Sequence, residues 1–150
     1  MKKIHLLSIG ITVLTLLTSN LYAVEHQIKM LNQGKEGIMV FEPSSLKVNV
    51  GDTVKFIPSD SGHNVMSYLV PTGGKGWKSG VGKGISITLN EEGVYIYRCE
   101  PHTVMAMVGV IQVGVATNKG AAIQAAKKLS SEFSLNNERL SKYLAQLGVM

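Results

Sequence analysis

The feature that most constrains this chain is a change of hydrophobic period near residue 114. Before that point, apolar and polar residues alternate in short runs such as 46–50 and 85–89, which is typical of strands with one buried face. After it, apolar residues recur at helical spacing, first over 122–129 and then over 140–147. The pattern predicts a sandwich of short strands followed by two helices.

The expected strands are separated by turn-forming residues and lie at 26–31, 37–41, 46–50, 54–56, 85–89, 94–99 and 107–113. Six glycines between Pro71 and Gly84 predict a loop, with Trp77 as a cap over the core. The two helices are expected within about 117–148, and their apolar stripes must be covered. We expect them to pack back onto the sandwich; a detached hairpin used for dimerisation is the alternative.

The first 23 residues have the pattern of an export signal. Lys2 and Lys3 precede an almost continuously apolar run from Ile4 to Leu17, and Ala23 is a small residue suited to signal peptidase. An uncleaved membrane anchor is the alternative, but a run of about 14 apolar residues is short of the roughly 20 needed to span a bilayer. We expect one mature domain over residues 24–150, with no membrane attachment after cleavage.

Composition narrows the class further. Hydrophobic residues make up 45% of the chain, which is too many for a disordered protein. Without Lys2 and Lys3, 13 basic and 10 acidic residues remain, and a net charge of +3 predicts no nucleic-acid binding. A single cysteine, Cys99, cannot form an intramolecular disulfide. In an exported protein such a thiol is expected to be buried or bound to a metal.

The segment that follows Tyr97 carries the chemistry. Cys99, His102, Met105 and Met107 lie on one tight loop directly after an expected strand. Thiolate, imidazole and thioether donors together favour copper over hard cations. A second histidine, His63, lies after the turn that closes the strand at 54–56, where the scaffold can hold it against this loop.

Two histidines, one cysteine and a weak axial methionine form the trigonal ligand set of a blue-copper electron-transfer site. A copper carrier would use the same donors in an open, exchangeable site. Two loops far apart in the sequence favour the closed site. The spacing of Cys99 and His102 provides no third group to orient a nucleophile, so we expect no enzyme.

The residues that surround these donors resemble the pseudoazurins, a family of cupredoxins. The resemblance covers nearly all of residues 26–114 and the two terminal helices. It rests on the segments Met30-Leu31-Asn32, Glu36-Gly37, Met39-Val40-Phe41-Glu42-Pro43, Gly51-Asp52-Thr53-Val54, Phe56-Ile57-Pro58, Gly62-His63-Asn64-Val65, Gly93-x-Tyr95 and Cys99-x-Pro101-His102.

This resemblance implies a mainly β, Greek-key sandwich of about eight strands that holds one type 1 copper ion. It further implies a monomer that transfers electrons in the bacterial periplasm. The implied acceptors are copper nitrite reductases and other respiratory reductases of denitrification, and the implied donors include cytochromes, all in transient complexes.

Residue by residue, the resemblance assigns His63, Cys99, His102 and Met107 as the copper ligands. Met105 is the alternative axial residue, because the related amicyanins place their methionine three residues after the histidine. The resemblance also implies that Asn64 ties the two ligand loops together. Met39 and Pro101 are implied to lie beside the exposed histidine, in a small apolar patch for docking.

The chain departs from the family in its charges. Ser61 and Gln33 stand where members often carry lysine. Lys78, Arg98 and Lys75 keep part of the expected basic docking ring, whereas Glu100 adds an acid close by. We therefore expect weaker electrostatic steering toward an acidic partner than in a typical family member.

Overall fold

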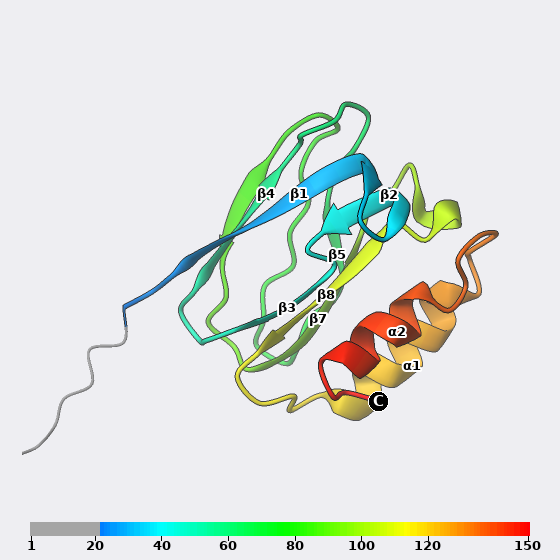
Figure 1. Ribbon diagram of the computed structural model, residues 1–150. Coiled ribbons are helices and arrows are strands. Elements are labelled where there is room, and N and C mark those ends of the chain that lie inside the picture. The colour runs from blue at the N-terminus through cyan, green and yellow to red at the C-terminus, as the bar shows by residue number, and fades with distance from the viewer. Residues whose placement is uncertain (1–21) are drawn as a thin grey trace, which may run out of the picture.

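The computed structural model describes residues 22–150 and shows two four-stranded sheets packed face to face (Figure 1). The first sheet has the strand order β2-β1-β4-β6 and the second β3-β8-β7-β5. Neighbouring strands are antiparallel except for the pairs β1–β4 and β3–β8, which are parallel. Most of the predicted export signal, residues 1–21, lies outside the described residues.

The eight strands match the expected runs to within a few residues, with one addition. They are β1 (Glu25–Gly34), β2 (Gly37–Glu42), β3 (Ser45–Val48), β4 (Thr53–Ile57), β5 (Met66–Leu69), β6 (Ile85–Thr88), β7 (Gly93–Arg98) and β8 (Val108–Val113). The sequence pattern alone did not predict β5, whose four side chains are all half-buried and do not alternate. Between β5 and β6 the chain forms the expected long loop.

The core between the two sheets is aromatic. Phe41, Phe56 and Tyr97 meet edge to face with ring centroids 4.9–6.1 Å apart, a favoured aromatic geometry. Trp77 stacks on Phe56 and is only 9% exposed, which confirms that it caps this core. On the neighbouring strand β8, Gly109 leaves room for the Tyr97 ring, because a Cβ there would overlap it.

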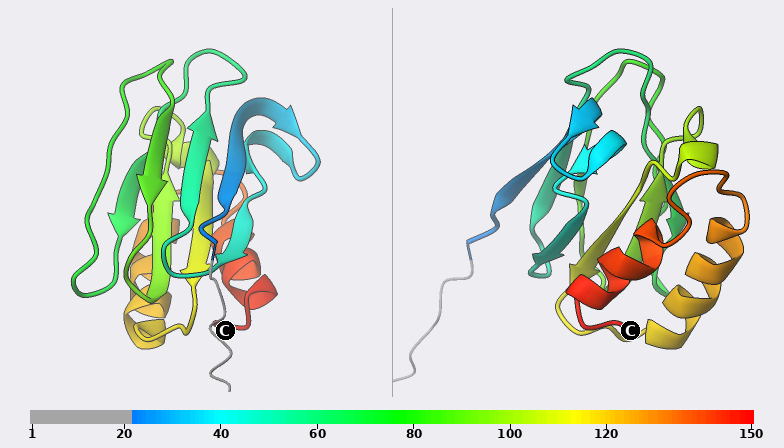
Figure 2. Two further views of the ribbon diagram at one scale, coloured as in Figure 1. Left: turned by 90° about the vertical axis from the view of Figure 1, so that its left-hand side faces the viewer. Right: turned by 45° about the vertical axis from the view of Figure 1, so that its right-hand side comes forward.

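Two helices, α1 (Lys119–Ser130) and α2 (Arg139–Gln146), cover the outer face of the second sheet (Figures 1 and 2). Their apolar stripes pack on Val94, Ile96, Val108 and Val110 of β7 and β8. All of β8 and nearly all of β7 are therefore buried. The helices pack on the sandwich as expected, and the alternative of a detached hairpin is wrong. Among residues 22–150, no helix has the length and apolar character needed to cross a membrane.

Candidate metal centre

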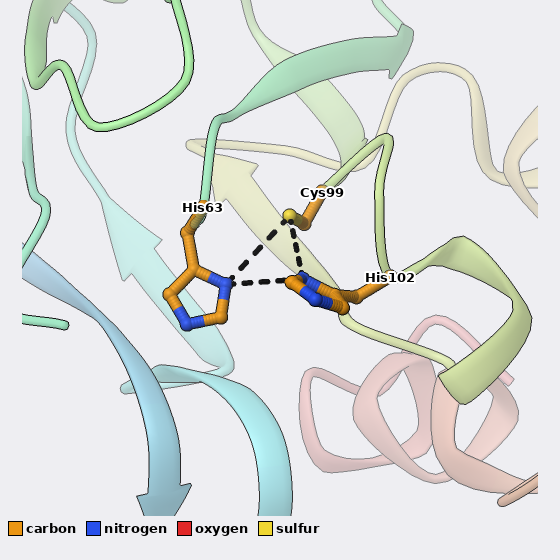
Figure 3. Close-up of side chains that lie close together, drawn as sticks. All are labelled: His63, Cys99 and His102. Atoms are coloured by element: carbon orange, nitrogen blue, oxygen red, sulfur yellow. Dashed lines mark hydrogen bonds between the residues drawn. The ribbon is translucent and has the colours of Figure 1, made fainter. Parts of the chain in front are cut away.

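Three side chains from two distant loops converge at one end of the sandwich. The Nδ1 atoms of His63 and His102 are 3.2 Å apart, and the Sγ of Cys99 lies 3.9 Å from the first and 3.4 Å from the second (Figure 3). Ligands held about 2.0–2.3 Å from a shared ion would be separated by roughly 3.3–3.8 Å. The side chains are therefore already spaced as ligands of one metal ion.

The loop after β4 positions His63. The imidazole is fully buried, and its Nε2 lies 3.0 Å from the side-chain oxygen Oδ1 of Asn32 in β1. An amide oxygen only accepts hydrogen bonds, so Nε2 donates the proton and Nδ1 keeps its lone pair for a metal. The carbonyl oxygen of His63 also accepts the N–H of Gly82 at 2.8 Å. Asn32 was not among the predicted site residues, since an asparagine near a strand end carries no signal of this role.

The second loop positions Cys99 and His102. Cys99 is fully buried at the end of β7, and its carbonyl oxygen accepts the hydroxyl of Thr103 at 2.9 Å and the N–H of His102 at 3.2 Å. A short 3-10 helix (Thr103–Met105) turns the chain back toward β8. His102 itself is only half-buried. Of the three converging ligands, it is therefore the one nearest to solvent.

A buried arginine of α2 links the ligand loop to β2. Arg139 is 6% exposed, and its Nη1 lies 3.1 Å from the carbonyl oxygens of both Met39 and Ala106. It also contacts the carbonyl oxygens of Ile38 and Met105 at 3.3–3.4 Å. Met39 and Ala106 both have left-handed backbones, with φ of 50° and 58°, which is unfavourable for non-glycine residues. The guanidinium group therefore stabilises two strained backbone positions, one within β2 and one in the ligand loop. The apolar stripe of α2 gave no sign of this role, because Arg139 lies outside the stripe and its partners lie far away in the sequence.

Electrostatics favour the metal-binding form of one histidine and oppose that of the cysteine. Burial, reinforced by the neighbouring His102, lowers the pKa of His63, so its imidazole is neutral as coordination requires. Burial raises the pKa of the Cys99 thiol, although backbone hydrogen bonds from Asn64 and His102 act in the opposite direction. Metal binding must therefore displace a proton from Cys99.

The two candidate axial methionines lie in different environments. Met107 is fully buried in the same apolar cluster as Cys99, and its carbonyl oxygen accepts the Cys99 N–H at 2.9 Å. Met105 is half-buried, and its carbonyl oxygen faces Arg139 and Asn136. The burial of Met107 beside Cys99 favours it as the axial donor.

Asn64 joins the two loops. Its Oδ1 accepts the backbone N–H of Glu100 at 2.9 Å, and its Nδ2 donates to Glu100 Oε2 at 2.7 Å. Lys78 completes the group with an ion pair to the same carboxylate at 2.8 Å. Hydrogen bonds from Lys78 and Asn64 lower the pKa of Glu100. Glu100, the acid that departs from the family pattern, thus takes part in the contact between the two loops.

The predicted docking residues are only partly free. Lys78 pairs with Glu100, and Arg98 pairs with Glu132 of the α1–α2 connection at 3.0 Å. Lys75 is exposed on the glycine-rich loop. Two of the three predicted basic groups are therefore locally balanced by carboxylates, which the sequence could not show because the partners are 22 and 34 residues away.

Two imidazole nitrogens and a thiolate sulfur, with a buried thioether close by, suit copper. Imidazole and sulfur donors are those that copper prefers, and hard cations prefer oxygen. The described residues therefore fit a copper ion.

Comparison with known proteins identifies the family. Residues 28–114 match the family of copper binding proteins, plastocyanin/azurin family. The chain is 35% identical to a pseudoazurin of Paracoccus pantotrophus over 145 residues, covering 95% of this chain and 97% of the relative. Its structure is similar to the crystal structure of pseudoazurin from Methylobacterium extorquens AM1, with a TM-score of 0.69 and 36% identity over 82% of this chain and 98% of that one.

Native pseudoazurin from Hyphomicrobium denitrificans is also similar, with a TM-score of 0.68 and 35% identity, covering 81% of this chain and 97% of the other. The matched region contains both ligand loops, and the two relatives of known structure are covered almost completely. The chain therefore belongs to the pseudoazurins, type 1 copper electron-transfer proteins within the plastocyanin/azurin family of copper-binding proteins.

Proposed function

We propose that His63, Cys99, His102 and Met107 hold the copper ion and that the protein carries single electrons between respiratory redox proteins. The observation that carries the proposal is the convergence of two imidazole nitrogens and one sulfur within 4.8 Å of one another, two of these groups being fully buried. When bound, copper supplies one-electron chemistry by cycling between Cu(I) and Cu(II). Burial of the donors favours this closed site over the open site of a copper carrier.

The protein holds its donors in place before the metal arrives. Asn32 orients the His63 ring, Asn64 fixes the spacing of the two loops, and Arg139 holds the second loop against β2. Such contacts keep ligand positions similar in both redox states. We propose electron transfer alone and no catalysis, because three of the four donors, His63, Cys99 and Met107, are fully buried and out of a substrate's reach.

His102 marks the surface through which partners would exchange electrons. It is half-buried, and the exposed Pro101 lies next to it in the chain. Met39, on the strand that Arg139 ties to the ligand loop, is half-buried. A small apolar contact of this kind suits a brief encounter, because weak redox complexes have small interfaces.

We propose that the acceptor is a copper nitrite reductase or another respiratory reductase, and that the protein works as a monomer in the periplasm. The resemblance to pseudoazurins and the export pattern of residues 1–23 support these assignments. Acidic surfaces on the partner would be attracted only weakly, since Lys78 and Arg98 are already paired with carboxylates.

Stopped-flow mixing of the reduced, copper-loaded protein with a copper nitrite reductase and nitrite tests the proposal. We expect reoxidation to slow at least tenfold in Pro101→Glu and to be unchanged in Val50→Glu, an exposed apolar residue in the turn between β3 and β4. Equal rates for the two variants would rule out docking beside His102. No reoxidation of the unaltered protein would rule out this acceptor.

A further inference from the structure

A second organised polar site lies at the other end of β4 from the loop that carries His63. Its centre is Asp52, a carboxylate that is only 1% exposed. Its Oδ1 accepts the N–H of Val24 at 2.9 Å, while its Oδ2 accepts the N–H of Asn49 at 3.0 Å and lies 2.9 Å from Nε2 of His26. The hydrogen bond from Val24 is the largest of the influences that lower the pKa of Asp52.

Val24 is also where the folded structure begins. Its carbonyl oxygen accepts the N–H of Thr53 at 2.9 Å, and β1 starts at the next residue. Both neighbours on the N-terminal side, Tyr22 and Ala23, are exposed, Tyr22 by 82%. The bond between Ala23 and Val24 therefore lies where the exposed segment meets the sandwich.

We propose that cleavage at this bond creates a free α-ammonium group on Val24, and that Asp52 binds it as the final contact of the mature fold. The inference rests on the proposed export. In the cleavage, which a peptidase of the export machinery would carry out, water adds across the peptide bond. Ala23 leaves with the new carboxylate, and the nitrogen of Val24 takes up protons to become an ammonium.

The site is better suited to an ammonium than to the peptide N–H it contacts in the uncleaved chain. A peptide N–H gives one neutral hydrogen bond, whereas an ammonium has three donors and a positive charge. Oδ1 accepts only the Val24 hydrogen bond among the described residues, so it can accept a second. A buried carboxylate is stabilised most by a charged partner, and His26 provides one only when protonated.

The test compares two exported forms of the full-length, copper-loaded protein. One is the natural chain. The other carries one extra alanine inserted after Ala23, so that the new amino terminus is displaced from Asp52. Intact mass first establishes where each chain begins. We expect the unfolding equilibrium constant of the natural form to be about tenfold smaller, and the ratio to fall toward one when both forms carry Asp52→Asn.

Equal unfolding constants with Asp52 present would overturn the capture of the ammonium alone. A purified protein that retains residues 1–23, or that begins elsewhere than at Val24, would overturn both the processing and the capture. The copper site is remote from Val24, so neither result bears on the electron-transfer function.

A second measurement keeps the inference testable if Asp52→Asn does not fold. Acylation of the Val24 amine at neutral pH can be followed by mass spectrometry. We expect it to be at least tenfold slower in the folded natural form than in the same protein unfolded in urea, and His26→Gln to retain most of that protection. An amine that reacts equally fast in both states would contradict the proposal.

Discussion

The segments that carry His63 and His102 bring their nitrogen atoms within 3.2 Å of each other, but they are held by different parts of the molecule. Side chains of the sandwich hold the first segment: Asn32 contacts the ring, and Ser79 Oγ accepts the N–H of Val65 at 3.1 Å. The second segment shares the Asn64 contact with the first and is held in addition from outside the sandwich, by the helical layer.

The contacts from that layer are specific. The N–H of Ser134 donates to the carbonyl oxygen of Val104 at 2.7 Å, and Arg139 reaches the carbonyl oxygens of Met105 and Ala106. The comparison shows a division of roles. The sandwich fixes a buried ligand in orientation and protonation, whereas the helices brace the loop that brings a half-buried ligand near the surface.

Replacing Arg139 is the strongest test of whether the helices brace the second ligand loop. Arg139→Met removes the side-chain donor from the carbonyl oxygens of Met39 and Ala106, two residues with strained backbones, so we expect unfolding to become easier by about 2–4 kcal/mol. Chemical denaturation measures the change. The control is Lys142→Met on the same helix, whose exposed amine lies 3.6 Å from Glu36 and should matter by less than about 0.5 kcal/mol.

A loss below about 1 kcal/mol in Arg139→Met would contradict the bracing role, because a single buried hydrogen bond to a charged group already contributes more. A change in the reduction potential beyond that of Lys142→Met would show that the bracing also acts on the ligands.

Removing Asn32 should affect the metal far more than the fold. Asn32→Ala frees His63 to adopt the other tautomer, and we expect copper affinity to fall by about 10- to 100-fold with little change in thermal stability, since Asn32 is exposed. Competition with a copper chelator measures the affinity. Gln33→Ala, at the next exposed position, is the control. Equal affinities for the two variants would show that Asn32 does not set the tautomer.

The loss of fold stability in acid should depend on Asp52, at one end of the sandwich, more than on Glu100, at the metal end. Because the pKa of Asp52 is lowered in the folded state, its ionised form stabilises the fold fully above the unfolded value of about 3.9. This contribution is lost as the pH falls toward the lower folded value. Denaturation midpoints measured from pH 6 to pH 3 should decline less steeply in Asp52→Asn than in the unaltered protein.

Glu100→Gln is the matched variant at the metal end, because the pKa of Glu100 is also lowered but its side chain is one-third exposed. Solvent screens such a group, so we expect its variant to keep most of the acid-induced loss. If Glu100→Gln reduced the loss of stability in acid and Asp52→Asn did not, Glu100 and not Asp52 would be the group responsible for that loss.

The smallest expected effect concerns docking charges near His102. Lys78→Glu should lower the rate of association with an acidic redox partner by roughly two- to fivefold at low salt and flatten its salt dependence. Glu100→Gln releases Lys78 from its ion pair and should raise the rate. Stopped-flow traces at several ionic strengths measure both, and an unchanged rate in both variants would exclude this face from docking.

The sequence pattern predicted those parts of the fold in which the hydrophobic or polar character of each residue matches its burial. Alternation located the strands at 46–50, 54–56 and 85–89, short apolar runs between turn signals located four more, and helical spacing located α1 and α2. The sequence pattern missed β5, because its four residues are all half-buried and show no alternation. The count of about eight strands came from the resemblance.

The site was predictable where residue type and spacing alone indicate metal ligands, as they do for Cys99 and His102. It was not predictable where a role depends on contacts across the fold. Asn32 is identified only by the ring that it faces, and Arg139 only by the carbonyl oxygens of loops about 35 and 100 residues away.

The central claim, that three converging side chains and Met107 bind copper as a type 1 site, is tested most directly by the visible absorption of the copper-loaded protein. We predict an intense band in the oxidised form that bleaches on reduction and is absent in Cys99→Ser. A colourless copper-loaded protein, or a band that survives in Cys99→Ser, would contradict the claim.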